Sequence, residues 1–413
     1  MNKEINIGLF GFGVVGSGLY NVLNLSNANH IKISKIVVKN PGKKRSIPAE
    51  NFSLDKDTIL LDLKINTVVE LINDPDEAYE IVKTALQHGK NVVSANKKMI
   101  AEHLNELIEL ASDNNVSFLY EAAVAGSIPI IRNLEEYYNN DTLSSIHGIV
   151  NGTTNFILTQ ANQGISYKKA LQIAQEKGFA ETDPTSDVDG FDSKYKLSIL
   201  IKHAFGIHVD SNSIFNNGIR NIKPRDIQYA NEKGYRIKLF ARAEKIDNQI
   251  IGFVAPHFVT QDNFSYQVNN EFNAITVEAA FSDKQLFIGK GAGSFPTASA
   301  VLSDISALVY DYKYEYRKSV IEGKLNFTSN FYVRVYLGSE NRTDLSKIDL
   351  IQEDESFFSD EYSFKIGWIV FSELAKFDFN QWNEISFIIL PNELELAEID
   401  HYILQNTTEL ILE

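Results

Sequence analysis

GLFGFGVVGSG, residues 8–18, joins a short apolar strand to the start of a helix. Gly11, Gly13 and Gly16 follow the spacing G-x-G-x-x-G, in which the first glycine permits a tight turn. The second lets backbone approach a pyrophosphate, and the third lets helix and strand pack closely. The helix start also presents unpaired N–H groups and a positive dipole end to an anion. The pattern predicts a dinucleotide-binding loop, with a plain strand–turn–helix as the simpler alternative. The expected contact residues are Gly11, Phe12, Gly13, Val14, Val15 and Gly16.

Beyond this loop, short apolar segments rich in Val and Ile alternate with segments that carry apolar residues at helical spacing. Such alternation favours a doubly wound parallel sheet. We therefore expect residues 1–135 to form an α/β domain of the Rossmann type. The expected strands are 4–10, 31–38, 67–72, 91–96 and 116–124, and the expected helices are 76–88 and 101–114.

The pattern changes after residue 135. A run of strand-like segments over 238–291 has no helices between them, which suggests an antiparallel sheet and an α+β domain over 136–325. Its last helix, expected over 297–317, would pack back toward the nucleotide domain. A strand that feeds a helix is expected over 145–158, and further helices over 167–177 and 193–205.

A third segment, 326–413, is expected to form a small C-terminal α+β domain. NFYVRVYLG (330–338) and EISFIILP (384–391) have the composition of strands. Between them, IGWIVFSELAKF (366–377) resembles a helix, and the acidic EDESFFSDEY (353–362) resembles a loop.

The composition of the chain excludes some kinds of site and disfavours some kinds of binding partner. The chain of 413 residues has no cysteine, so disulfides, thiolate metal sites and a cysteine nucleophile are excluded. A formal net charge of -15 disfavours binding to nucleic acid, and no basic stripe is present. No apolar run reaches the ~18 residues of a membrane span, and the N-terminus lacks the features of a signal peptide. We expect a soluble cytoplasmic protein.

The end of the second strand bears on the choice of cofactor. NAD-preferring sites usually place an acidic residue there, to bind the ribose 2′-OH. Here the sequence continues VVKNPGKKRS (37–46), with Lys39 as the first charged residue. A basic loop favours NADP, or acceptance of both NADP and NAD, although such a loop can simply be solvated.

An acidic segment, GFAETDPTSDVDGFDSKYK (178–196), precedes and enters the expected helix of 193–205. Asp183 and Asp189 are expected to be a turn residue and a cap residue, since carboxylates stabilise helix N-termini. Its spacing does not fit an EF-hand. Asp192 and Lys196 stand four residues apart and so share one side of the helix.

A dehydrogenase needs a group that protonates the nascent alkoxide, and a positioned lysine can serve. Lys196 is one candidate. Lys97, at the carboxyl end of the fourth expected strand, is the other, because ligands gather at such ends in open α/β sheets. Nearby carboxylates raise a lysine pKa, so those around Lys196 are expected to serve mostly another cation, such as a substrate ammonium.

Taken together, these segments resemble the homoserine dehydrogenase family over residues 1–325. The resemblance rests on their order and on the spacing from Glu181 to Lys196. The other segments that carry it are SANK (94–97), EAAVAGSIPII (121–131), NGTTNFIL (151–158) and GKGAGSFPTASAVLSDI (289–305).

The resemblance implies the reversible reduction of L-aspartate 4-semialdehyde to L-homoserine with NAD(P)H, in threonine, methionine and isoleucine biosynthesis. It makes 136–325 a catalytic and dimerisation domain of a homodimer or higher homo-oligomer. Lys196 would be the general acid/base, with Lys97 as its partner at the carbonyl and cofactor. The implied substrate residues are Glu181, Asp187, Asp192, Gly152 and Thr153. The implied cofactor residues add Lys39, Ser94, Lys97 and Gly293 to the glycine loop. Glu121, Val124, Gly126 and Ile128 resemble a monovalent-cation site for Na⁺, ligated mainly by backbone oxygens.

Three positions depart from the family pattern. LINDP (71–75) has Asn73 and Asp74 where the family usually has two glycines, and Ser127 replaces a common glycine. YLGSENRTDLSKI (336–348) lacks the Pro-Gly turn of ACT regulatory domains. We therefore expect a degenerate ACT-like domain whose effector motif is lost.

Two alternatives remain open at this point. Another two-domain amino-acid oxidoreductase, such as an aspartate dehydrogenase, would not need the carboxylates and lysine of 181–196. A non-catalytic NADP-binding regulator would bind cofactor without turnover.

Overall fold

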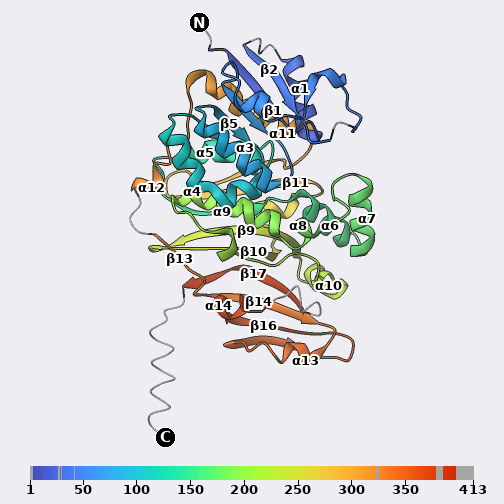
Figure 1. Ribbon diagram of the computed structural model, residues 1–413. Coiled ribbons are helices and arrows are strands. Elements are labelled where there is room, and N and C mark those ends of the chain that lie inside the picture. The colour runs from blue at the N-terminus through green and yellow to red at the C-terminus, as the bar shows by residue number, and fades with distance from the viewer. Residues whose placement is uncertain are drawn as a thin grey trace. The chain divides into compact units, whose positions relative to one another are not determined.

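The computed structural model describes residues 3–26, 28, 30–40, 42–321, 325–377 and 385–396 (Figure 1). By packing, the chain divides into two compact units, and each is described by itself. Unit 1 consists of residues 1–152, 192–214 and 271–323, and unit 2 of residues 153–191, 215–270 and 324–413. These units cut across the boundaries expected after residues 135 and 325, so the three-part division stays a prediction.

Unit 1 contains the predicted parallel sheet, with strand order β3-β2-β1-β4-β5-β6. The order reverses at β1, which pairs in parallel with both β2 and β4. Such a switch point opens a crevice at the carboxyl ends of the strands, where ligands bind. The strands are β1 (Ile5–Phe10), β2 (Ile31–Val37), β3 (Phe52–Ser53), β4 (Thr67–Glu70), β5 (Asn91–Ser94) and β6 (Phe118–Leu119).

Helices follow these strands, as the doubly wound pattern requires. Helix α3 starts where the Asp74 side chain accepts a hydrogen bond from Glu77 N at 3.1 Å, with Pro75 as its first residue. The carboxylate that departs from the family pattern is therefore a helix cap. The helices are α1 (Val14–Leu25), α2 (Asp57–Leu60), α3 (Pro75–Gln87) and α4 (Lys97–Asp113), with a 3₁₀ turn at Ala49–Asn51.

The rest of unit 1 combines further helices with an antiparallel group of strands, in which β11 pairs with both β7 and β12. The helix expected over 297–317 is α11 (Ser294–Ala307), followed by a 3₁₀ turn at Leu308–Tyr310. Residues 311–317 are not helical, and Asp311 takes a left-handed conformation that ends the helical segment. The remaining elements are η2 (Glu121–Ala123), α5 (Ile130–Glu135), β7 (Leu143–Ile149), α9 (Phe191–Phe205), η3 (Ser211–Ser213), β11 (Phe272–Ala279), β12 (Asp283–Lys290) and α12 (Lys318–Ile321).

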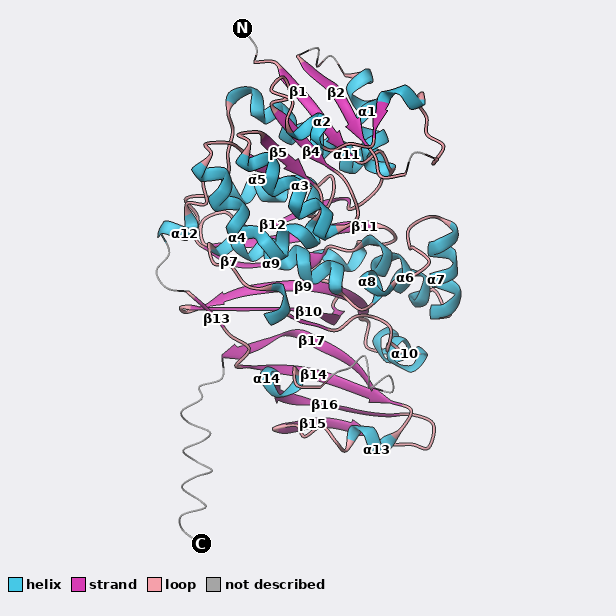
Figure 2. Ribbon diagram, in the orientation of Figure 1, coloured by secondary structure: helices cyan, strands magenta, loops and turns pink. Residues whose placement is uncertain are grey.

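Unit 2 is built on a sheet of order β9-β10-β17-β14-β16-β15, in which β10 also pairs with β8 and β13 (Figure 2). Strands β9 and β10 form a hairpin, and β17 lies beside β10 in parallel. Its elements up to residue 270 are α6 (Gly152–Asn162), α7 (Tyr167–Glu176), α8 (Thr185–Val188), β8 (Phe215–Asn216), α10 (Pro224–Glu232), β9 (Arg236–Ile246), β10 (Gln249–Val259) and η4 (Phe264–Gln267).

The C-terminal segment has the order β-α-β-β-α-β with strand order 4-1-3-2, the ferredoxin-like arrangement. This confirms the predicted α+β class. Phe331 and Phe371 stack at 4.6 Å between ring centroids and pack into a buried cluster with Phe253 and Phe387. The elements are β13 (Asn326–Phe327), β14 (Phe331–Ser339), α13 (Arg342–Leu345), β15 (Gln352–Phe357), β16 (Ser363–Val370), α14 (Phe371–Leu374) and β17 (Ile385–Leu396). Residues 397–413 of this expected domain lie outside the described residues.

Two predictions in this segment are wrong. Residues 366–370, expected to be helical, belong to β16 and pair with β14. Residues 353–357, expected to be a loop, form the edge strand β15, which is exposed along its whole length. Charges on an edge strand discourage pairing with other chains, and they also remove the alternation by which a strand is recognised.

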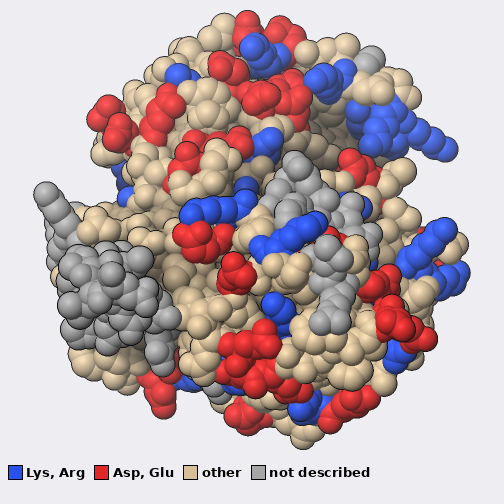
Figure 3. Space-filling view, turned by 90° about the horizontal axis from the view of Figure 1, so that it is seen from below, with Lys and Arg blue, Asp and Glu red and all other residues tan. Residues whose placement is uncertain are grey.

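Acidic and basic side chains are interspersed in small groups over the face in Figure 3. Within the described part of the chain, no helix combines the length and apolar character needed to cross a membrane.

Candidate active site

The glycine loop has the geometry that its spacing predicts. Gly11 has φ of +92°, and a Cβ there would lie 2.5 Å from the carbonyl oxygen of Leu71. A Cβ on Gly16 would lie 2.3 Å from the carbonyl oxygen of Gly11. A Cβ on Gly13, in contrast, would meet no atom within 4 Å. The turn and the helix contact are therefore tight, while the position that should face a pyrophosphate is open.

The start of α11 lies beside the start of α1. Gly293 precedes α11 with φ of +119°, and the Ser294 hydroxyl donates to the carbonyl oxygen of Val14 at 2.9 Å. Val14 is 68% exposed, whereas Phe12 is 7% exposed. The Phe12 ring therefore belongs to the core, while contacts of Gly13, Val14 and Gly293 with a dinucleotide stay a prediction.

Lys39 follows β2, as expected, but it has acidic neighbours that the sequence did not suggest. Its ammonium lies 3.1 Å from Glu77 Oε2 and 3.9 Å from Asp74 Oδ2, both at the start of α3. The hydrogen bond to Glu77, together with these charges, raises the pKa of Lys39. A 2′-phosphate at this position would have to compete with the two carboxylates for Lys39.

A cluster of charges lies where α9, α4 and the end of β7 meet. Lys196 Nζ donates to Asp192 Oδ2 at 2.7 Å and to the carbonyl oxygen of Val150 at 2.7 Å. Lys97 Nζ lies 2.9 Å from Asp192 Oδ1. Asn151 Nδ2 donates to Asp192 Oδ2 at 2.9 Å. The structure therefore brings both predicted catalytic lysines together on one carboxylate.

Asp192 is almost inaccessible, with 4% of its side chain exposed. Burial alone would raise its pKa, but the charges of Lys196 and Lys97 outweigh burial and hold that pKa well below its ordinary value. Its place in the first turn of α9 favours the anion further. Asp192 thus bonds both lysines, and its expected role toward a substrate ammonium stays a prediction.

Val150 and Asn151 are functional candidates that the sequence reasoning missed. Both follow β7 and reach α9 across a separation of more than forty residues. The motif NGTTNFIL contains Asn151, but only its neighbours Gly152 and Thr153 had been singled out. A Cβ on Gly152 would lie 2.5 Å from the carbonyl oxygen of Glu271, so the close approach requires glycine.

The other predicted substrate residues belong to unit 2. Glu181 is exposed, and Asp187 is half-buried on α8. The Thr153 hydroxyl donates to the carbonyl oxygen of Phe179 at 2.6 Å and ties the acidic segment to α6. Their roles toward a substrate stay predictions.

Two further carboxylates of the acidic segment have structural roles. Asp183 accepts a hydrogen bond from Thr185 N at 3.1 Å, as expected of a turn residue. Asp189, expected to be a cap, also forms a two-point ion pair with Arg220, at 2.7 and 2.9 Å. That pair holds the segment to a loop thirty-one residues away in sequence.

The expected cation loop begins with a buried carboxylate. Both oxygens of Glu121 accept backbone hydrogen bonds, from Ile131 N and Arg132 N, each at 2.8 Å. Burial, followed by the charge of Asp304, raises the pKa of Glu121 to about 8. The Glu121 side chain therefore binds backbone N–H groups in the first turn of α5, and its role toward a cation stays a prediction.

The backbone of this loop curls at Ala125 and Gly126, whose φ angles are +55° and +56°. No hydrogen bond among the described residues reaches the carbonyl oxygens of Val124 or Gly126, although both residues are buried. The described residues also contain no group of three or more His, Asp or Glu suited to a metal ion. Backbone oxygens, the ligand type that the resemblance implies for this loop, stay a prediction.

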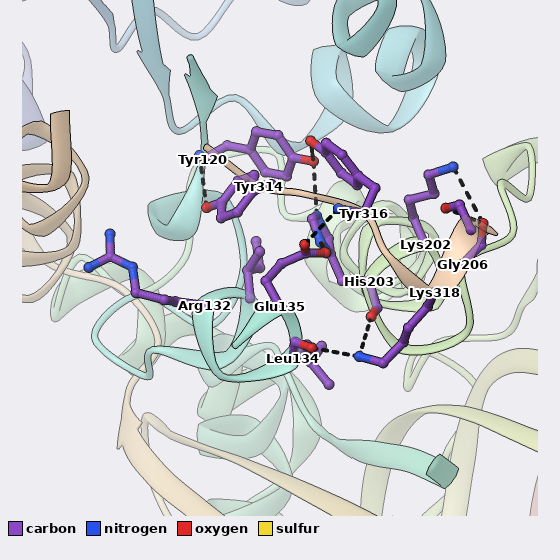
Figure 4. Close-up of polar contacts among 12 residues, drawn as sticks. Tyr120, Arg132, Leu134, Glu135, Lys202, His203, Gly206, Tyr314, Tyr316 and Lys318 are labelled. Carbon is purple, nitrogen blue, oxygen red and sulfur yellow. Dashed lines mark hydrogen bonds and ion pairs between the residues drawn. The ribbon is translucent and has the colours of Figure 1, made fainter. Parts of the chain in front are cut away.

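The C-terminal half of α9 is anchored by a buried polar network (Figure 4). His203 Nδ1 lies 2.6 Å from Glu135 Oε1, and its Nε2 lies 2.9 Å from the Tyr120 hydroxyl. Tyr120 and Tyr316 hydroxyls are 2.9 Å apart, and Tyr316 N donates to Glu135 Oε2 at 3.0 Å. The network fixes the helix that carries the charged cluster.

Comparison with known proteins agrees with this geometry. A family model described as "Homoserine dehydrogenase, NAD binding domain" matches residues 11–121, and one described as "Homoserine dehydrogenase" matches residues 129–306. A homoserine dehydrogenase of Lactococcus lactis is 37% identical over 317 residues, covering 74% of this chain and 74% of that protein. One of Neisseria gonorrhoeae is 39% identical over 313 residues, covering 73% and 72%.

Solved structures give the same result. A homoserine dehydrogenase from Thiobacillus denitrificans has a TM-score of 0.82 at 29% identity, covering 95% of this chain and 100% of that one. A hyperthermophilic archaeal homoserine dehydrogenase in complex with NADPH has a TM-score of 0.64 at 27% identity, covering 75% and 99%.

Proposed function

The chain belongs to the homoserine dehydrogenase family, and from that premise we propose that Lys196 is the acid/base group of a homoserine dehydrogenase reaction. The reaction is the reversible reduction of L-aspartate 4-semialdehyde to L-homoserine, in the supply of threonine, methionine and isoleucine. The observation that carries the proposal is the cluster in which Asp192 bonds both Lys196 and Lys97.

In the proposed reaction, Lys196 transfers the proton. A bound nicotinamide supplies or accepts the hydride at the carbonyl carbon. Lys196 has three N–H donors, of which one points to Asp192 and one to Val150. We assign the third to the substrate oxygen, so that the forming alkoxide takes this proton and homoserine returns it in reverse. A forming alkoxide is far more basic than an amine, so an ammonium group that is bonded to Asp192 can donate a proton to it.

Lys97 and Asp192 support that transfer. Asp192 holds two ammonium groups that would otherwise repel each other. Lys97, 41% exposed at the start of α4, is the group that reaches from the cofactor crevice toward the carbonyl. Glu181, Asp187, Asp192, Gly152 and Thr153 remain the proposed substrate residues.

The cofactor is proposed to be NADP, with NAD accepted. Support comes from the open space at Gly13, the absence of acidic residues in the first turn of α1, and Lys39 after β2. A positive helix end and open backbone suit a pyrophosphate. The relative in complex with NADPH supports nucleotide binding.

A monovalent cation, Na⁺, is proposed for the loop 121–128. Its ligands would be backbone oxygens of Glu121, Val124, Gly126 and Ile128. Support comes from Val124 and Gly126, two buried residues whose carbonyl oxygens accept no hydrogen bond from the described residues, since buried polar groups need partners. Homo-oligomerisation is proposed from the family resemblance, a cytoplasmic location from the sequence features above, and loss of effector control from the missing Pro-Gly turn in residues 336–348.

The deciding experiment is the oxidation of NADPH in the presence of aspartate semialdehyde, with NADH assayed in parallel. We expect turnover that depends on the aldehyde. If neither cofactor is oxidised, the proposed function is wrong.

A further inference from the structure

Glu70 is a fully buried carboxylic acid at the carboxyl end of β4, with 0% of its surface exposed. Its Oε1 accepts a hydrogen bond from Ile72 N at 2.7 Å, and its Oε2 accepts one from the Ser94 hydroxyl at 2.6 Å. A buried carboxylate is costly unless such bonds compensate it. Glu70 has no part in the reaction proposed above, so its buried hydrogen bonds point to a different role.

The bonds continue from Glu70 into the turn between β5 and α4. The Ser94 oxygen accepts a hydrogen bond from Asn96 N at 3.1 Å. The Asn96 side chain then donates to the carbonyl oxygen of Ile72 at 3.2 Å and accepts from Met99 N at 3.2 Å. Glu70, Ile72, Ser94 and Asn96 thus form a closed ring of hydrogen bonds across the ends of β4 and β5.

This ring fixes the place where α4 begins. Asn96 is the N-cap of α4, and Lys97 is the first residue of that helix. Lys97 Nζ reaches Asp192 Oδ1 at 2.9 Å. We propose that Glu70 is a positioning residue that sets Lys97 against Asp192 by fixing the turn from β5 into α4. The inference rests on the proposed function, because it assumes that Lys97 takes part in the reaction.

Glu70 itself cannot reach a substrate. It is fully buried, and both of its oxygens are already occupied by donors. It acts through Ser94 and Asn96, whose backbone it orients. Ser94 was expected to contact the cofactor, but its hydroxyl is buried and is donated to Glu70.

The ring depends on the ionisation of Glu70. Burial raises the pKa of Glu70 to about 7, while the bonds from Ser94 and Ile72 act to lower it. No charged side chain of the described residues contributes to this pKa. As pH falls through about 7, the carboxylate gains a proton and one of its acceptor sites becomes a donor. The positioning of Lys97 should therefore weaken on the acid side.

The first test is Glu70→Gln in the full-length chain. Its amide would turn an N–H donor either toward Ile72 N, where the bond is lost, or toward the Ser94 hydroxyl, which can then no longer donate to residue 70. We expect kcat to fall about 10- to 100-fold, as misplacement of a reacting group by about 1 Å can cause, with the NADPH Kd changed less than about 3-fold. The fall in wild-type kcat below pH of about 7 should be absent from the variant.

The matched control is Glu106→Gln on α4, the helix that Lys97 begins. Glu106 pairs with Lys83 at 2.9 Å and is 44% exposed, so the variant removes the same charge outside the ring. We expect its kcat to stay within about 2-fold of wild type. Glu70→Asp, whose shorter carboxylate cannot reach both donors, replaces the glutamine variant if that variant does not fold.

A double-mutant cycle separates positioning from general stability. If Glu70 acts through Lys97, then Glu70→Gln added to Lys97→Ala should change kcat by less than about 2-fold further. An unchanged kcat in Glu70→Gln alone, or an equal loss in both backgrounds, would overturn the inference.

A crystal structure of Glu70→Gln provides a test that does not need turnover. We expect Lys97 Nζ to move beyond 4 Å from Asp192 Oδ1 (the two are 2.9 Å apart in the wild type). An unmoved Lys97 would refute the inference even in an active enzyme. If the wild type shows no turnover, the proposed function fails, and this distance alone still decides the positioning role.

Discussion

The ammonium of Lys196 lies 2.7 Å from Oδ2 of Asp192, one helical turn earlier on α9. The pair is nearly buried, and the other carboxylate oxygen carries Lys97. One anion thus holds two cations beside the crevice of the parallel sheet. This arrangement makes the position of each lysine dependent on Asp192.

Asp192→Asn should therefore disable the enzyme without abolishing cofactor binding. The amide cannot compensate two ammonium groups, and they repel each other at close range. We expect kcat to fall on the order of 100-fold, with the NADPH Kd nearly unchanged, measured by steady-state kinetics and fluorescence titration. Asp183→Asn, which only loosens a turn, is the control. A wild-type kcat in Asp192→Asn would contradict this role.

Gly13 and Gly16 should respond differently to alanine. Gly13→Ala places a methyl group in open space, so the melting temperature should hold while the NADPH Kd rises about 10-fold or more. Gly16→Ala would bring its Cβ to 2.3 Å from the carbonyl oxygen of Gly11, so the fold itself should lose stability. Equal loss of stability in both variants would show that the space around Gly13 is not open.

Cofactor choice should depend on the ion pair of Lys39 with Glu77. Lys39→Ala should weaken NADPH relative to NADH by about 10-fold, the size of one charge-assisted hydrogen bond. Glu77→Gln should shift the preference toward NADPH, because it frees Lys39 for a 2′-phosphate. The ratio of kcat/KM for the two cofactors measures both effects. If the ratio stays constant in both variants, Lys39 does not bind the 2′-phosphate.

Glu135 should make the fold sensitive to acid. Burial alone would raise the pKa of Glu135, but the bond and charge of His203 lower it below its ordinary value. A lowered folded-state pKa contributes stability above the unfolded value of about 4.3, and that stability is lost as pH falls through the folded pKa. Glu135→Gln should cost about 2 kcal/mol at pH 7, and its difference from wild type should shrink in acid.

The neighbouring Glu136, half-exposed on the same segment, supplies the control for that prediction. Glu136→Gln should change the free energy of unfolding by less than about 0.5 kcal/mol. Urea unfolding at several pH values measures both variants. A difference between Glu135→Gln and wild type that stays constant down to pH 3 would contradict the linkage.

Local patterns predicted the nucleotide-binding half well. The glycine spacing, the strand–helix alternation and the pairing of Asp192 with Lys196 are all set by residues close in sequence. The ring around Glu70 and the contact from Asn151 to Asp192 join segments more than twenty residues apart. No periodicity in the sequence reports such contacts.

The C-terminal segment shows where prediction of secondary structure from local sequence fails. IGWIVFSEL carries apolar residues at a spacing that suits a helix, yet pairing with β14 holds residues 363–370 as a strand. Tertiary pairing overrides local preference there. Residues 352–357, which include three acidic residues, have no buried face, so their sequence lacks the alternation typical of a strand. Their strand conformation is seen in their pairing with β16.

The central claim is that Lys196 moves the proton. Its most direct test is kcat for Lys196→Ala, beside Lys202→Ala as a matched lysine on the same helix. The account predicts a loss of about 10²–10⁴-fold for Lys196→Ala, with the NADPH Kd retained and Lys202→Ala close to wild type. A kcat for Lys196→Ala within a few-fold of wild type would contradict it.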